Sequence, residues 1–393
     1  MYFIPTPQIE AVKLEIIFPI DYRKLDNGQT LVPFFSLHMA LEGTGDMNSE
    51  QIDDFFDYHA SEVEIHTGYE KHGLELLTTT RHFSQVLPVF RSLLTEAVFP
   101  DKELNKRKSQ KKLTISLQKE QTGTRANQLI RRALFGNDHP FGYIAEEDEV
   151  DRIDRDILNR YYHENFRVTP EIFVTGNLSD ADLKEVEGAF GDLPYSGEPI
   201  YGNPYQSLPD RRLTEYKPQA VQSSIRLGKT LISKSHPDYH AVTVFNTFLG
   251  GYFGSRLIKN IREEKGYTYG IHSFLGSLKS ADYLLVLADV KEGHADQVIE
   301  EVYKELSVLS QEPLPPDELE IVRNYMIGHL LAQFSSPFDL MTHFKKVHHA
   351  GMDFGFYQEQ LRYIKNFTLE EMMAIGQQYF RPGTFKEVVV GAK

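Results

Sequence analysis

The chain of 393 residues contains no cysteine. Disulfide bonds, thiolate metal sites and a cysteine nucleophile are therefore excluded. The Gly-x-Ser-x-Gly sequence that positions a nucleophilic serine in many hydrolases is also missing. Covalent catalysis by either of these common routes is not expected.

Basic charge is scarce, and long apolar runs are absent. Lysine and arginine number 42 against 56 aspartates and glutamates, which gives a formal net charge of −14. Nucleic-acid binding needs basic surface, so we expect no nucleic-acid partner. No run of consecutive apolar residues reaches the length of about 18 that a membrane-spanning helix needs. The start, Met1 followed by Tyr-Phe-Ile-Pro, has no basic n-region, so no signal peptide is expected either.

Two clusters that could bind ligands do not match known sites. The run Gly250–Ser255 is rich in glycine but lacks the Gly-Lys-Ser/Thr ending of a phosphate loop, and a turn between helices fits it better. His343, His348 and His349 lie near one another in sequence, but a spacing of five residues does not place His343 and His348 on one helix face. We expect these histidines to be solvated.

What is present predicts two domains of one type. Apolar residues make up 41% of the chain and charged residues 25%, as in ordinary globular proteins. Its length exceeds one ordinary core. The order strand, two helices, hairpin, three helices, strand occurs twice along the chain. We therefore expect an α+β protein with two homologous α/β-layered domains, each a mainly antiparallel sheet covered by helices.

The domain boundaries follow from a proline-rich segment in the middle of the chain. It has little apolar periodicity, as is typical of a linker. The predicted domains are residues 1–195 and 219–393, joined by a linker over 196–218. The prolines of the segment are Pro194, Pro199, Pro204, Pro209 and Pro218.

The most informative stretch is Gly250–Ser273, GGYFGSRLIKNIREEKGYTYGIHS. It predicts a short helix that begins after Ser255, ends at Gly266 and leads into a strand. Arg262 lies in the last turn, and Tyr269 follows seven residues later on the strand, where alternation places it on the face of Tyr267. An isolated pair at this spacing also fits a basic helix end and a core tyrosine. A guanidinium and a phenol on adjacent elements could instead bind a peptide carbonyl.

The run from Ser255 to Tyr269 resembles the second domain of the pitrilysin-type zinc peptidases. This family includes insulin-degrading enzyme and the mitochondrial processing peptidases. The resemblance implies that Arg262 and Tyr269 contact the backbone of a peptide substrate near the zinc. It also implies duplicated α+β halves joined by a linker, as the element order predicts.

The zinc motif of this family is degenerate in the chain. Family members carry H-x-x-E-H on a helix, where two histidines bind zinc and the glutamate acts as general base. The register set by His38, Met39, Gly43 and Thr44 places Phe34 at the first histidine and Leu37 at the glutamate. His38 alone retains the family's residue type, and we expect it to be a core or interface histidine on a core-facing helix.

The third zinc ligand of the family is missing as well. The resemblance places it, a glutamate, roughly 75 residues beyond the motif. That spacing falls between Thr114 and Ser116, and the run Lys111–Gln118 contains no carboxylate. A catalytic zinc site needs three protein ligands and a bound water. We therefore expect no zinc and no catalytic residue in this chain.

One further feature comes from the resemblance. The strand that matches Val63–Tyr69 lies at a sheet edge in active family members and pairs with the substrate. Free backbone groups at an edge can bind an extended peptide without side-chain chemistry.

These features predict a non-catalytic subunit of a heterodimeric zinc peptidase. Its partner would be a related subunit with the intact zinc motif and the zinc, and the substrate a peptide or unfolded protein. One alternative is a purely structural or peptide-binding relative without a peptidase role, similar to the core proteins of the cytochrome bc1 complex. A self-sufficient peptidase with a site of another kind is the third reading.

Overall fold

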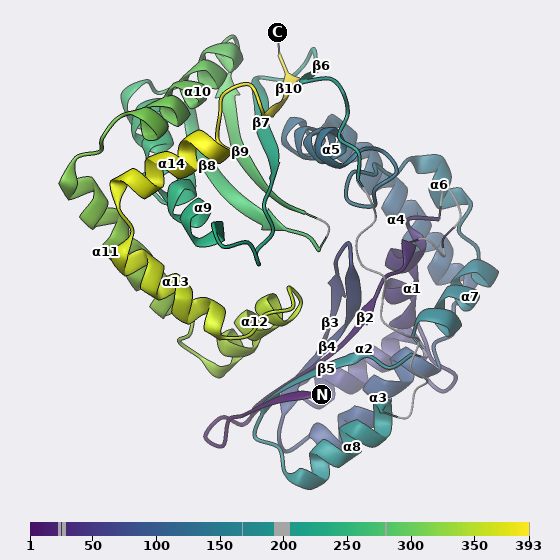
Figure 1. The fold of residues 1–393 in the computed structure, drawn as a ribbon. Helices are drawn as coiled ribbons and strands as arrows, with labels where there is room; N and C mark the ends of the chain where they lie inside the picture. Colours follow the sequence, from purple (N-terminus) through teal and green to yellow (C-terminus); the bar gives the residue numbers. More distant parts are fainter. Residues whose placement is uncertain (23–24, 26–28, 167, 192–204, 280, 393) are drawn as a thin grey trace. The chain divides into compact units, whose positions relative to one another are not determined.

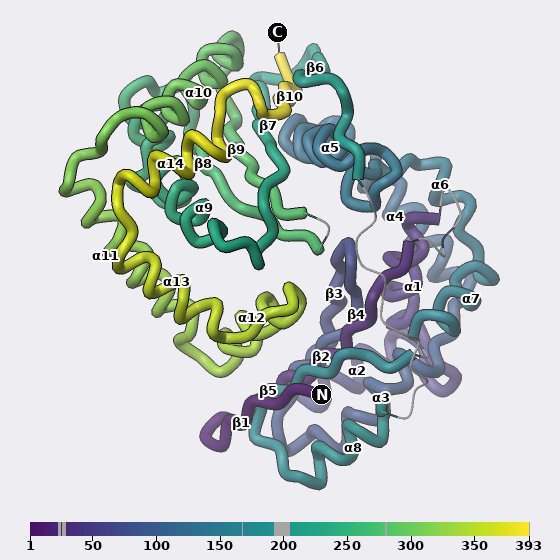
Figure 2. Tube along the Cα trace, in the orientation of Figure 1, coloured from purple at the N-terminus to yellow at the C-terminus, as the bar shows by residue number. Residues whose placement is uncertain are grey.

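The computed structural model describes residues 1–393 except 23–24, 26–28, 167, 192–204, 280 and 393. The contacts divide the chain into two compact units, and Figure 2 traces the chain through both. Unit 1 comprises Met1–Ser116, Ala145–Tyr201 and Ser336–Met341, and unit 2 comprises Leu117–Ile144, Gly202–Ser335 and Thr342–Lys393.

Unit 1 is a five-stranded sheet with helices on one face (Figure 1). Its elements are β1 (Tyr2–Pro5), β2 (Ala11–Pro19), α1 (Val32–Ala40), α2 (Ser49–Tyr58), β3 (Glu62–Thr67), β4 (Lys71–Thr79), α3 (Phe83–Thr95), α4 (Asp101–Glu120, which continues beyond Ser116 into unit 2), α6 (Glu147–Asp151), α7 (Arg155–Asn165), β5 (Glu171–Gly176) and α8 (Asp180–Phe190).

The strands of unit 1 are ordered β1-β5-β2-β4-β3. β1 runs parallel to β5, and the remaining pairs are antiparallel. Alternate residues of β2, from Val12 to Phe18, are buried against the helices, as the period of a strand requires. Lys13 and Glu15 consequently point to the opposite face of the sheet.

Unit 2 contains a second five-stranded sheet. Its elements are α5 (Thr122–Phe135), β6 (Arg212–Tyr216), β7 (Gln222–Leu231), α9 (Tyr239–Asn246), the π-helices η2 (Thr247–Gly251) and η3 (Ile258–Glu264), β8 (Thr268–Ser277), β9 (Asp282–Lys291), α10 (Ala295–Gln311), α11 (Pro316–Ala332), α13 (Gly355–Asn366), α14 (Leu369–Tyr379) and β10 (Lys386–Gly391). α12 (Pro337–His348) begins in a segment of unit 1 and ends in unit 2.

The sheet of unit 2 is apolar on both faces, because helices cover both (Figure 1). Leu284 and Val286 of β9 belong to the main core, whereas Leu285 and Tyr283 pack in a second cluster with α5. α5 lies over β7 and β10. Continuous apolar strands of this kind are typical of sheets buried on both sides.

The two sheets repeat one topology. In unit 2 the order is β6-β10-β7-β9-β8, which matches the order in unit 1 strand for strand, and β6 again runs parallel to the last strand. The predicted class, two homologous layered units with mainly antiparallel sheets, is confirmed. β1 and β6, the short first strands, were not predicted. β6 lies inside the predicted linker 196–218, because its backbone pairs with β10 despite the surrounding prolines.

Two helical predictions differ from the structure. The sequence from Lys102 to Phe135 predicts one long helical region, but it breaks at Gln121, whose backbone is extended (φ −74°, ψ 111°), so α4 and α5 are separate helices. α5 packs in unit 2, although its sequence lies within the predicted first domain, 1–195. No helix among the described residues is both long and apolar enough to cross a membrane.

His343 is buried, not solvated. It lies on α12, a helix that the sequence did not predict, and its Nδ1 is 3.2 Å from the hydroxyl of Tyr357. Its ring also packs against Phe334, 5.0 Å between centroids. The histidine is therefore a core residue of unit 2 that satisfies one ring nitrogen within the protein.

Candidate functional site

Arg262 lies on η3, which is wound more widely than an α-helix. The amide of Lys265 donates to the carbonyl of Asn260, five residues earlier, at 3.1 Å. Gly266 follows with φ +64°, a left-handed conformation that stops the helix as predicted. π-helical turns are rare in proteins overall, and many of those that occur lie at functional sites.

The guanidinium of Arg262 is available for a ligand. Its central carbon lies 4.9 Å from the ring centroid of Phe253, which is 68% exposed. Among the residues that the structure describes, Arg262 forms no ion pair and no hydrogen bond. Neighbouring Arg256, by contrast, forms a bidentate pair with Glu318 at 2.8 and 2.6 Å. The donors of Arg262 thus remain free, while an aromatic ring restricts the position of its head group.

Tyr269 lies on β8, the edge strand of the second sheet, and is 92% exposed. A core tyrosine is therefore excluded. The expected common face with Tyr267 is wrong: Tyr267 precedes the strand and packs on His294, 4.9 Å between ring centroids. The regular alternation breaks because β8 contains a bulge between Thr268 and Ile271.

The structure thus places Arg262 and Tyr269 on consecutive elements of unit 2, and each has a polar group without a protein partner among the described residues. Both donors could approach the carbonyl or oxyanion of a bound peptide. The sequence named both residues as candidates but gave no indication of the contact with Phe253 or of the bulge. A glycine two positions after Thr268 is the one signal in the sequence for the bulge.

The degenerate zinc motif lies on α1, a helix packed into the core of unit 1. Leu37 is fully buried. The Nδ1 of His38 bonds to the carbonyl of Phe34, 2.8 Å away, and the two rings lie 3.9 Å apart. His38 is half-buried, and its ring nitrogen is engaged within its own helix.

Positive charge gathers beside His38 where a metal ion would need anionic ligands. From α4, the ammonium of Lys111 lies 3.7 Å above the ring of Phe34. Arg107 pairs with the buried Glu42 at 2.6 Å. Burial and the charges of Arg107 and Lys111 lower the pKa of His38, outweighing its hydrogen bond to Phe34 and the charge of Glu42. These residues do not fit a zinc ion, because two cations would repel it and one imidazole cannot hold it.

The expected place of the third ligand is also apolar. Thr114 and Ser116 are exposed, whereas Ile115 between them is 5% exposed and packs in the core. Lys111 and Ile115 are four residues apart and therefore share the face of α4 that carries Arg107. The position that corresponds to the missing glutamate is thus occupied by a core isoleucine and not by an exposed residue.

The opposite face of the first sheet carries an ionic cluster that the sequence analysis missed. Ligand atoms of Glu15, His66 and Glu75 lie within 4.8 Å of one another, as a metal site would require. The ammonium of Lys13 already lies 2.5 Å from Glu75 and 3.6 Å from Glu15. Burial would raise the pKa of Glu75, but hydrogen bonds from His66 and Lys13 outweigh it and hold that pKa below its usual value. A lysine thus supplies the cation here.

The edge strand expected to bind peptide is β3. It is the last strand of the first sheet among the described residues, with β4 as its one neighbour. Val63 and Ile65 face the core, whereas Glu62 and Glu64 are exposed. The backbone geometry that peptide pairing requires is therefore present.

Comparisons with known proteins agree with the resemblance. Residues 152–326 match the family model described as the peptidase M16 inactive domain. The chain is 26% identical over 316 residues to the uncharacterized zinc protease YmxG of Bacillus subtilis, covering 79% of this chain and 76% of that protein. It is 22% identical to the non-peptidase homolog YmxG of Helicobacter pylori, covering 84% of this chain and 77% of the homolog.

A solved structure shows the same fold over the whole chain. The peptidase M16 inactive domain from Pseudomonas fluorescens superimposes with a TM-score of 0.87 at 18% identity, covering 100% of this chain and 95% of that one. The resemblance predicted from the sequence is thus confirmed: residues 152–326 match the inactive domain of the M16 zinc peptidases, and the chain lacks the zinc motif of that family.

Proposed function

We propose that this chain is the non-catalytic subunit of a heterodimeric zinc peptidase, in which Arg262 and Tyr269 bind the substrate at the zinc site of a related partner. The observation that carries the proposal is the exposure of Tyr269, 92%, together with an arginine on the preceding element whose donors have no partner among the described residues. Because their donors are not used within the described part of the protein, both side chains are free to hydrogen-bond to a ligand.

The residues of the first unit support the proposal that the partner holds the zinc and this chain binds the substrate. There Phe34 stands at the position of the first zinc ligand and Lys111 lies over its ring, which supports a first unit without zinc. The metal would then come from the partner, where it would polarise the scissile carbonyl and activate water. This chain contributes a cationic donor, Arg262, and a neutral one, the phenol of Tyr269. Both stabilise the negative charge that develops on the substrate.

The direct test combines this chain with a related subunit that carries H-x-x-E-H. Arg262→Ala and Tyr269→Phe should each lower kcat/KM for an unfolded-peptide substrate by roughly 10²–10³, the range for loss of one such donor. Assembly, followed by size-exclusion chromatography, should not change, because both side chains are exposed or half-exposed.

Matched controls are available, one on η3 itself and one on an exposed helix of the other unit. Lys259→Ala removes an exposed cation from η3, and Tyr58→Phe removes the hydroxyl of a tyrosine that is 83% exposed on α2. Both controls should keep full activity. Equal turnover of Arg262→Ala, Tyr269→Phe and the controls would reject the proposal.

The second candidate is a structural or peptide-binding role without peptidase activity. The name of the Helicobacter pylori relative, non-peptidase homolog, favours it. In that case the chain would bind peptide or partner with unchanged affinity in the Arg262 and Tyr269 variants, and no zinc-bearing subunit would gain activity from it.

A further inference from the structure

The bulge in β8 determines where Tyr269 points. Thr268 pairs with Val290 and Ile271 with Ala288, so Tyr269 and Gly270 together oppose the single residue Asp289. In an unbroken strand Tyr269 would share the face of Ile271, which is 1% exposed, because side chains alternate. The extra residue reverses this relation and turns the phenol outward.

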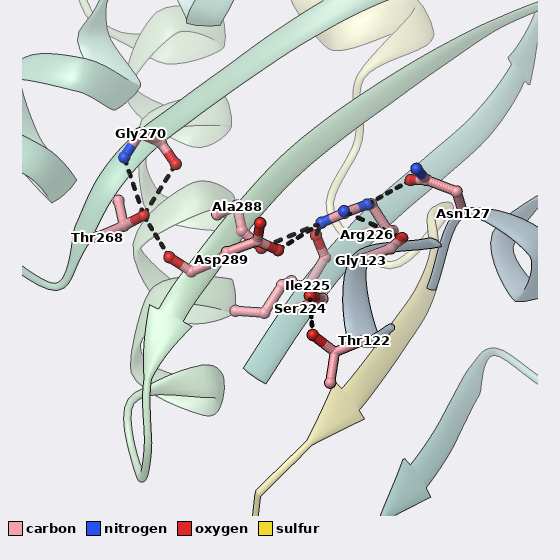
Figure 3. Close-up of polar contacts among 10 residues, drawn as sticks. All are labelled: Thr122, Gly123, Asn127, Ser224, Ile225, Arg226, Thr268, Gly270, Ala288 and Asp289. Atoms are coloured by element: carbon pink, nitrogen blue, oxygen red, sulfur yellow. Dashed lines mark hydrogen bonds and ion pairs between the residues drawn. The ribbon is translucent and has the colours of Figure 1, made fainter. Parts of the chain in front are cut away.

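One hydroxyl holds the bulge in place. The Oγ1 of Thr268 is 2.6 Å from the carbonyl oxygen of Asp289 and 2.8 Å from that of Gly270, and it accepts a hydrogen bond from the amide of Gly270 at 3.1 Å (Figure 3). A hydroxyl has one proton to donate, so the two carbonyls share it. Thr268 itself is 7% exposed, so water does not easily replace these contacts.

Steric demand does not explain the bulge. Gly270 has no positive φ, and a Cβ added to it would meet no atom within 4 Å. An ordinary residue could therefore occupy this position. What distinguishes the bulge is the bonding of its backbone amide and carbonyl to a side chain, in place of the ladder bonds that a bulge interrupts.

Asp289 of β9, whose carbonyl accepts the hydrogen bond from Thr268, is itself held by further hydrogen bonds. The side chain of Asp289 accepts a hydrogen bond from Arg226 at 3.3 Å, and Arg226 donates to Asn127 at 2.6 Å and to the carbonyl of Gly123 at 3.3 Å (Figure 3). Arg226 is 5% exposed. Asp289, against which the bulge is bound, is thus connected to α5 through a buried guanidinium.

We propose that Thr268 is a positioning residue, whose hydroxyl fixes the β8 bulge so that the phenol of Tyr269 faces the substrate. This inference rests on the proposed function for the role of Tyr269, but the effect of Thr268 on the bulge can be measured without a partner. Valine is the natural test because it keeps the shape of threonine and removes the hydroxyl.

The first experiment uses the isolated full-length chain. In Thr268→Val, hydrogen exchange of the Gly270 amide should be roughly five- to tenfold faster than in the wild type, as expected for loss of one hydrogen bond. Thr268→Ser should restore protection. Ser277→Ala, which removes a hydroxyl bound to Asp282 at the far end of β8, should leave Gly270 unchanged. Unchanged exchange in Thr268→Val, or failure of serine to restore it, would overturn the inference.

The second experiment uses the reconstituted complex and a double-mutant cycle. If Thr268 acts through Tyr269, Thr268→Val should lower kcat/KM in the wild-type background and have no further effect in Tyr269→Phe. Additive losses would show that Thr268 acts on stability alone and would reject the positioning role. If Tyr269→Phe itself has no effect while the exchange result holds, the proposed function fails and the control of the bulge by Thr268 stands.

Discussion

Two residues of α1 and one of α4 determine whether the first unit can bind zinc. We predict that Phe34→His with Leu37→Glu still neither binds zinc tightly nor cleaves peptide. The double mutant has two imidazole ligands, at positions 34 and 38, and still lacks the third zinc ligand. A carboxylate at the buried position of Leu37 would also lower the stability of the fold. Adding Ile115→Glu should tighten zinc binding by at least roughly tenfold, because this residue and not its neighbours shares the face of Lys111.

The measurement is competition with a chromophoric chelator for each variant. Ser116→Glu in the same double mutant is the matched control, since Ser116 is exposed, and it should not improve zinc binding. Tight zinc binding and peptidase activity in the double mutant alone would mean that a different carboxylate completes the site.

A second residue, His72, should give the stability of the chain a dependence on pH. It is 2% exposed on β4, and burial lowers its pKa to about 3. Its Nδ1 has no hydrogen-bond partner among the described residues. Because the pKa in the folded state lies below the ordinary 6.5, the stabilisation is complete above pH 6.5 and is lost as the pH falls toward 3.

The prediction concerns the slope of the unfolding free energy between these pH values. In His72→Gln the slope should be shallower than in the wild type by up to about 1.4 kcal/mol per pH unit, the value for one proton. His163→Gln, which changes an exposed histidine of α7, should keep the wild-type slope. Urea denaturation at a series of pH values measures both, and equal slopes for all three proteins would contradict the prediction.

At the level of elements, the attachment of α5 to the second sheet depends on Arg226. Besides its bonds to Asn127 and Gly123, its guanidinium donates to the carbonyls of Ile225 and Ala288, at 2.9 and 3.2 Å. Arg226→Met should lower the free energy of unfolding by roughly 1–3 kcal/mol, because buried acceptors lose their donor.

The matched control is an exposed ion pair in the same unit. Arg212 contacts Asp296 at 2.5 Å, but both side chains are solvent-exposed, so Arg212→Ala should cost about 0–1 kcal/mol. Urea unfolding measures both variants. A loss for Arg226→Met no larger than for Arg212→Ala would show that apolar packing in the cluster of α5 holds the helix without the arginine.

The elements that sequence reasoning predicted and missed differ in a physical way. The start of α8, Asp180–Phe190, can be predicted from local sequence, because Ser179 and Asp182 form a capping box that is visible there. β6 was missed because its five residues gain their structure from pairing with β10, whose paired residues lie 175 positions later in the chain. The β8 bulge was missed for the same reason, since it is defined by the partner strand.

The candidate site shows the same limit. The family resemblance singled out Arg262 and Tyr269, but their exposure could not be predicted from the sequence, because it depends on the wide turn of η3 and the bulge of β8. The loss of the zinc ligands was visible in the sequence, whereas the placement of Lys111 over Phe34 was not. Contacts between helices distant in sequence determine which side chain fills a vacated position.

For the whole molecule, duplication would allow one unit to lack a metal site while the other carries the proposed substrate-binding residues. Both sheets have the same strand order, yet α1 of the first unit carries the degenerate motif and η3 of the second carries the arginine. Each unit has its own hydrophobic core, and the stability of the first therefore does not require zinc. Loss of the ligands leaves the fold intact.

The last prediction follows from this independence. The isolated chain should contain less than stoichiometric zinc, hydrolyse no peptide, and unfold at the same temperature with and without a chelator. Metal analysis and thermal unfolding test this directly. When a related subunit with H-x-x-E-H is added, the complex should contain one zinc per pair, and peptide hydrolysis should depend on both chains. One tightly held zinc per isolated chain, together with a lower unfolding temperature after chelation, would show that this chain has a metal centre of its own. If the zinc-bearing subunit were fully active alone and gained nothing from this chain, the structural role would be the better account.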